Sequence, residues 1–239
     1  YIWSGSGFRS PIYSLGFGII NRLGVVVDLR EYETNNKYAY IERDGIRRSC
    51  KVFKECWRTF IPTLSREVKP PSFARLIKEA DLCLTSATTT VFLDFSARGS
   101  NLGRVYFRVL CDTCHGRQFV MLALRTNGPT FKGATFCRKS TSHIALQDYL
   151  TEKGRRSNEP LLTIKEEKRG TGSKGKLFKF GQFRPTASFT ILTKTLNDSY
   201  WPGYFGDVVE GMNVIDRAAS AEYDIKEIMI TQCGIVLEK

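Results

Sequence analysis

Short runs of alternating apolar and polar residues, separated by glycine, proline and asparagine, make up most of this chain. In residues 14–57 the segments "GFGIINRLGVVVDL", "KYAYIER" and "IRRSCKVF" predict short strands. The last two flank Asp44-Gly45, a dipeptide typical of tight hairpin turns. We therefore expect residues 1–57 to form a small β-rich module.

A proline-containing segment follows this module. Residues 58–89 contain Pro62 and Pro70-Pro71, which predict a linker. Ser72 is placed to cap a short helix, "FARLIKEADLCL", whose apolar side chains repeat at helical spacing. The module before this linker has the size of an SH3, Tudor or OB domain, and its pattern does not select among them.

Residues 90–239 alternate many short strands with two short helical segments. The stretch 151–176 is polar and rich in glycine, which predicts a surface loop with one strand, "PLLTI". Many short strands with few helices indicate a mainly β fold, closed as an antiparallel barrel. The predicted strands are 91–97, 103–110, 134–139, 177–183, 187–193, 205–209 and 227–233, and the predicted helices are 115–126 and 214–219.

The composition indicates the cellular compartment and the charge of the partner. The seven cysteines are an odd number without framework spacing, which favours a reducing compartment, and no apolar run is long enough to span a membrane. We expect an intracellular protein, cytoplasmic or nuclear, and a first residue other than Met predicts a piece of a longer chain. The formal net charge of +12 favours an acidic partner. The oligomeric state is left open.

Two distant segments resemble the two ends of cyclophilins, the peptidyl-prolyl isomerase family. They are "VFLDFSARGSNLGRVYFRVL" at 91–110 and "FGDVVEGMNV" at 205–214, followed by "ITQCG" at 230–234. The resemblance covers roughly residues 90–237 and is weak in its middle. It implies an eight-stranded closed barrel with two helices, preceded here by the small β module.

The resemblance places Arg138 on the family's catalytic arginine. Such a guanidinium hydrogen-bonds the substrate and weakens the amide conjugation that creates the isomerisation barrier. The surroundings depart from the family pattern: Cys137 replaces a histidine, and the glutamine that braces the arginine has no clear counterpart, because a one-residue deletion makes Ala145 or Leu146 its neighbour. The wall and floor of the proline pocket fall near His143, Ile144 and Thr190.

Loss of apolar pocket residues predicts little or no isomerase activity, since each lost burial removes about 1.5–3 kcal/mol of binding. The leading interpretation is a protein-interaction module that binds a protein or peptide, and a weakly active isomerase is the enzymatic alternative. Trp201 and Pro202 are hypothesised to refill the pocket in part. The expected groove beside Arg138 consists of Phe136, His143, Ile144, Phe189, Thr190 and Trp201.

Nucleic-acid binding through the N-terminal module and the basic segment 153–184 is the second alternative, because cations and phenylalanines are interleaved towards the end of that segment. The same alternation is typical of a half-buried strand. The candidate contacts are Lys168, Arg169, Lys174, Lys176, Lys179 and Arg184.

No motif indicates a cofactor. Cys111-Asp112-Thr113-Cys114-His115 spells a haem-attachment pattern, but it is short and overlaps the junction of a predicted strand and helix. A zinc site would need a second ligand pair. We predict no metal and no cofactor, and a somewhat lowered pKa for the Cys137 thiol beside Arg138.

Overall fold

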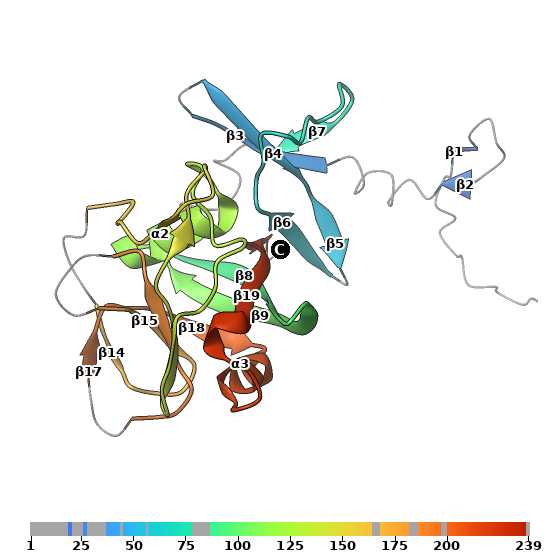
Figure 1. Ribbon diagram of the computed structural model, residues 1–239. Coiled ribbons are helices and arrows are strands. Elements are labelled where there is room, and N and C mark those ends of the chain that lie inside the picture. The colour runs from blue at the N-terminus through green and yellow to red at the C-terminus, as the bar shows by residue number, and fades with distance from the viewer. Residues whose placement is uncertain are drawn as a thin grey trace, which may run out of the picture.

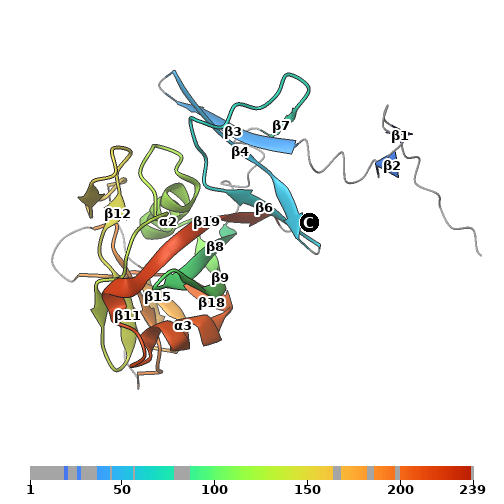
Figure 2. The same ribbon diagram turned by 45° about the vertical axis from the view of Figure 1, so that its right-hand side comes forward.

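A ten-stranded antiparallel sheet organises this protein, shown as a computed structural model in Figures 1 and 2. Its strand order is β10-β11-β16-β15-β18-β9-β8-β19-β6-β5. The structure describes residues 19–20, 26–27, 37–43, 45–55, 57–77, 87–163, 168–181, 186–196 and 200–237. The strands of this sheet are β5 (Phe53–Glu55), β6 (Arg58–Pro62), β8 (Thr88–Ala97), β9 (Ser100–Leu110), β10 (Arg138–Lys139), β11 (His143–Leu146), β15 (Lys176–Lys179), β16 (Phe189–Leu192), β18 (Tyr204–Glu210) and β19 (Ile228–Leu237).

Smaller ladders accompany the main sheet. The predicted hairpin at Asp44-Gly45 is confirmed as β3 and β4, and Gly45 has a positive φ of 69°. A third strand, β7, adds to it in parallel. These ladders comprise β1 (Ile19–Ile20) with β2 (Val26–Val27), β3 (Lys37–Arg43) with β4 (Ile46–Lys51) and β7 (Arg75–Ile77), β12 (Tyr149–Leu150) with β13 (Arg156–Ser157), and β14 (Arg169–Thr171) with β17 (Tyr200–Pro202).

The two helices predicted within residues 90–239 are confirmed. Helix α2 (Cys114–Leu124) begins after Thr113, whose side chain accepts a hydrogen bond from the Gly116 amide and so satisfies a free donor of the first turn. Helix α3 (Met212–Ala219) follows Gly211, which has a positive φ of 88°. The two helices lie at opposite ends of the body formed by β8, β9, β18 and β19 (Figures 1 and 2). A short 3-10 turn, η2 (Ile225–Glu227), precedes β19.

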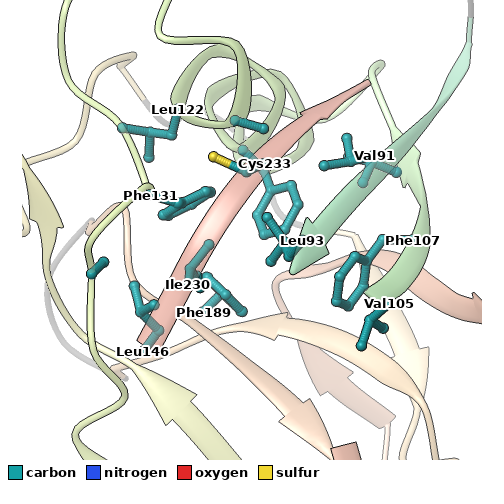
Figure 3. Packing of buried hydrophobic residues seen from close by; sticks show 14 of the residues in the cluster. Val91, Leu93, Val105, Phe107, Leu122, Phe131, Leu146, Phe189, Ile230 and Cys233 are labelled. Atoms are coloured by element: carbon teal, nitrogen blue, oxygen red, sulfur yellow. The ribbon is translucent and has the colours of Figure 1, made fainter. Parts of the chain in front are cut away.

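A cluster of aromatic rings fills the core between the sheet and α2. Phe119 of α2 lies 5.0 Å from the rings of both Phe131 and Phe189, and Phe136 lies 6.1 Å from Phe189. Figure 3 shows Phe131, Phe189, Leu146 and Ile230 converging from different elements. All are buried, so this interior is the main hydrophobic core of the described chain.

The fold is mainly β, and eight strands of the sheet come from residues 88–237, but the predicted closure into a barrel is wrong. The segment before β10 meets the start of β19 at one isolated bridge, Thr135 to Met229, and through three backbone hydrogen bonds between residues 133–136 and 228–230. These contacts do not make a strand ladder, so the sheet does not close continuously among the described residues. The second half of β19 pairs instead with β6, from Gly234↔Pro62 to Leu237↔Thr59. The sheet is thereby extended by β6 and β5.

Three local expectations are also corrected. Residues 58–62, predicted as linker, form β6, because Phe60 and Ile61 are both buried, one on each face of the sheet. Residues 75–77, predicted as helix, form β7, and the apolar side chains of Phe73 and Leu76 stay exposed rather than making a buried helical face. The described residues of "PLLTI" are irregular, and Leu161 donates its amide to the Gln118 side chain.

A buried arginine connects the β3-β4 hairpin to the main body. The Arg48 side chain is 4% exposed and donates to Glu152, which follows β12, over 2.8 Å. Arg66 donates to the same carboxylate. Burial opposes ionisation of Glu152, but Arg48, Arg66 and Arg125 together hold its pKa below the ordinary 4.5. The hairpin and the body therefore share one ion-pair network.

We expect Arg48→Ala to lower the free energy of unfolding by about 2–4 kcal/mol, because it removes the buried member of the pair. Arg66→Ala is the matched control: its side chain is half exposed, so its loss should cost less than about 1 kcal/mol. Urea denaturation of both variants measures the difference, and equal losses would contradict the assignment.

The pH dependence follows from the lowered pKa of Glu152. A carboxyl with a lowered folded-state pKa stabilises the fold above its unfolded value, and that stability is lost as the pH falls towards the folded value. The stability gap between wild type and Glu152→Gln should therefore shrink below about pH 4.5. Denaturation curves at several acidic pH values would test this.

Candidate functional site

Arg138 lies on the outer face of the sheet formed by β10, β11, β16 and β15. The register pairs Arg138 with Ala145, Ala145 with Thr190, and Thr190 with Phe178. Because side chains alternate between the two faces of a sheet, these residues share one face. Their neighbours in sequence point into the core: Ile144, Leu146, Leu177 and Ile191 are all fully buried.

A pocket of about 590 Å³ opens on this outer face beside Arg138. Trp201 of β17 is half-buried and forms part of its wall, with its ring 6.2 Å from that of Phe178. Thus the indole faces the pocket, as the hypothesis of a partly refilled pocket requires. The pocket is lined by Arg138, His143, Lys179, Phe180, Gly181, Thr190, Leu192, Trp201 and Pro202.

Arg138 is an exposed side chain without an internal acceptor. Among the residues that the structure describes, no hydrogen bond or ion pair joins its guanidinium. Its partner across the ladder is Ala145, whose methyl group cannot accept a hydrogen bond. The guanidinium therefore presents its donors to a ligand, but no side chain opposite fixes its direction.

Thr190 lies at the floor of the pocket and is 6% exposed. Its hydroxyl donates to the Ile144 carbonyl oxygen over 3.0 Å. The hydroxyl is thus satisfied by the backbone, and it replaces apolar surface at the floor by a small polar side chain.

His143 forms the rim of the pocket next to the β10-β11 turn. Its Nδ1 lies 2.8 Å from the Ser140 hydroxyl. Burial, and after it the positive charge of Arg138, lowers the pKa of this imidazole below 6.5. At neutral pH His143 is therefore an uncharged group that can donate or accept one hydrogen bond.

Cys137 corrects one expectation. Burial raises the pKa of its thiol, an effect larger than the lowering by the backbone and by the Arg138 charge. The thiol donates to the Ala145 carbonyl oxygen over 3.4 Å. A thiol that stays protonated is a poor nucleophile, so the predicted lowering of the Cys137 pKa is wrong.

The predicted groove residues separate into two groups. Arg138, His143, Thr190 and Trp201 come together around the pocket. Phe136, Ile144 and Phe189 are at most 1% exposed and belong to the core, because the register turns them to the inner face. The sequence analysis missed Phe180, Gly181 and Leu192 as pocket residues, and it considered Lys179 only as a nucleic-acid contact.

Three of the six predicted nucleic-acid contacts have acidic partners. Lys174 pairs with Asp216 over 2.8 Å and Lys176 with Asp207 over 2.7 Å. Lys168 pairs with Asp112, and Arg169 lies exposed in β14 opposite Pro202. Arg184 lies outside the described residues. The segment is therefore less electropositive than its sequence suggests.

The haem-like motif occupies the junction between β9 and α2. Cys111 and His115 are buried, and the Cys114 thiol donates to the Thr163 carbonyl oxygen. In the described part of the chain no three side chains of His, Cys, Asp or Glu are grouped as metal ligands. Burial also raises the pKa of Cys233 to about 11, which is typical of an inert core thiol.

Comparisons with known proteins add the following. No family model and no curated protein matches this sequence. Among solved structures, the Mimivirus cyclophilin is similar, with 18% sequence identity and a TM-score of 0.49 over 68% of this chain and 96% of that chain. Within the described residues, no helix has the length and apolar character needed to cross a membrane.

Proposed function

We propose that residues from about 90 onward form a divergent cyclophilin-like domain that binds a protein or peptide partner, with little or no prolyl isomerase activity. Support comes from the sequence motifs at 91–110 and 205–234, and from a mainly β fold with two helices. The observation that carries the proposal is the pocket beside Arg138, where an exposed guanidinium borders an aromatic wall.

Weak catalysis follows from two features of the same pocket. A catalytic donor must be fixed in direction before the transition state forms, because preorganisation supplies most of its effect. Arg138 faces Ala145 rather than a bracing side chain, and the floor residue is Thr190. Peptide binding needs only that the guanidinium and the aromatic wall contact the ligand. The pocket therefore favours binding over catalysis.

A weakly active isomerase is the second candidate, because Phe180, Leu192, Trp201 and Pro202 keep apolar surface next to the guanidinium. Nucleic-acid binding has less support, since three of the candidate lysines are neutralised by carboxylates.

The deciding experiment compares wild type with Arg138→Ala in a protease-free isomerase assay and in calorimetric titration with a proline-containing peptide. We expect both proteins to leave isomerisation at its uncatalysed rate. Peptide binding should weaken about tenfold in the variant, because it loses charge-assisted hydrogen bonds.

Arg155→Ala is the control, an exposed arginine outside the pocket lining, and should bind like wild type. Isomerase activity that disappears in Arg138→Ala would instead establish a working enzyme. Peptide binding that is unchanged in Arg138→Ala would contradict the proposed groove.

A further inference from the structure

The pocket beside Arg138 has a one-sided distribution of charge. Its lining includes the cations Arg138 and Lys179 together with His143. No aspartate or glutamate is among the described residues that line it. A ligand that enters this pocket therefore meets the exposed guanidinium of Arg138, which no described residue of the lining neutralises.

The Arg138 guanidinium differs from two lysines at and before the start of β15. Lys174 and Lys176 form ion pairs with carboxylates of α3 and β18. The guanidinium of Arg138 has no such partner within the described ranges. Arg138 therefore has guanidinium donors available to a ligand, and it borders a pocket whose lining is partly apolar.

Lys179 is held at the pocket by the β17-β18 turn. Its amide donates to the Gly203 carbonyl oxygen over 2.9 Å. A Cβ atom at Gly203 would lie 2.4 Å from Cγ of Lys179, so the lysine stem packs directly on that glycine. The positive φ of 79° at Gly203 also favours glycine there. The turn therefore fixes the position of the lysine stem beside the pocket.

The rest of the lining is apolar. Phe180, Leu192, Trp201 and Pro202 supply surface for an aliphatic or ring side chain. A guanidinium is a planar fork of donors that matches a carboxylate, and an ammonium adds a second positive charge. The combination of an apolar wall with two cations fits an apolar residue that has an acidic neighbour.

We propose that the partner segment bound in this pocket is acidic: an apolar side chain packs on Trp201 and Phe180 while an adjacent Asp or Glu contacts Arg138 and Lys179. This inference rests on the proposed function, since it specifies the ligand of the same groove.

The test titrates the full chain with two capped peptides of equal length that share a central Ala-Pro pair. Glutamates flank the pair in one peptide and glutamines in the other. We expect the acidic peptide to bind about tenfold more tightly at low salt, with the preference falling as ionic strength rises. Arg138→Gln and Lys179→Gln should each remove most of that preference.

The matched control is Lys226→Gln, which removes one positive charge from an exposed position in η2, outside the pocket. It should keep the full preference. An equal loss in Lys226→Gln would overturn the inference, because it would assign the effect to net charge. Circular dichroism of each variant checks that the fold is kept.

Further outcomes separate this inference from the proposed function. Equal binding of both peptides that still depends on Arg138 would keep the groove and overturn its acidic specificity. Binding of neither peptide would overturn both. If a single-stranded RNA of mixed sequence displaces the acidic peptide, and its binding depends on Arg138 and Lys179, the ligand is a nucleic acid and the inference fails.

Discussion

Replacing Phe189 by alanine is expected to lower the free energy of unfolding by about 3–5 kcal/mol. The side chain is 1% exposed and touches rings from three directions: Phe119, Phe131 and Phe136 lie 5.0, 5.3 and 6.1 Å away. Its removal leaves a cavity at the centre of the core, which neighbouring rings cannot fill without leaving their own contacts. Chemical denaturation measures the effect.

The control for this prediction is Phe180→Ala. Phe180 is half-buried and lines the pocket, so its loss should cost less than about 1.5 kcal/mol and should weaken peptide binding. The two phenylalanines thus have opposite expected effects, on stability and on binding. A Phe189→Ala variant with wild-type stability that no longer binds the peptide would show that Phe189 belongs to the groove. It would contradict the assignment of Phe189 to the core.

The pair Phe189 and Thr190 shows how much of the site could be predicted from the sequence. Alternation along the strand predicts that the two residues face opposite sides, and the similarity to cyclophilins placed both near the pocket. Which of them faces the core depends on the ladder with β11 and β15, which pairs residues far apart in the chain. The alternation of Phe189, Thr190 and Ile191 favours Phe189 as the inward residue, and the ladder confirms it against the placement by resemblance.

The strand β6 is the clearest case in which local pattern was misleading. Its residues include Pro62, and proline favours a linker over a central strand. In the structure Pro62 is the last residue of the strand, where the missing amide interrupts little of the ladder. The hairpin β3-β4 and the helices α2 and α3, in contrast, depend on turn and capping residues close in sequence, and were predicted correctly.

The pattern of charged residues in the sequence was also misleading about the site. The net charge of +12 and the lysines between 168 and 179 suggested an extended basic surface. Their carboxylate partners come from residues 112, 207 and 216, which are distant in the sequence. Only the fold shows which cations are neutralised. Among the described residues, the guanidinium of Arg138 lines the pocket and has no acceptor.

The second large effect is expected at Gly234, where β19 meets β6. An alanine Cβ at this position would lie 2.1 Å from the Ile61 carbonyl oxygen and 2.7 Å from Cα of Pro62. Both are backbone atoms, so the clash can be relieved only if β6 moves away from β19. We expect Gly234→Ala to lower the free energy of unfolding by about 3 kcal/mol, as for severe overpacking.

Amide hydrogen exchange locates this change. In wild type the Thr63 amide donates to the Cys233 carbonyl oxygen over 2.9 Å and should exchange slowly. In Gly234→Ala, Thr63 and the β6 amides should exchange quickly, and a protease should cleave within residues 53–77. Met229→Ala, an exposed change on the same strand, should leave both measurements as in wild type.

The same variant also tests whether residues 90–239 are an independent domain. If they are, releasing β6 exposes the edge of β19 but leaves exchange in β8 and β9 slow, since those strands keep their own ladder. If β8 and β9 lose protection together with β6, the β5-β6 pair is an integral part of the fold. A Gly234→Ala variant with wild-type stability and slow exchange at Thr63 would show that β6 is not held on β19 in solution.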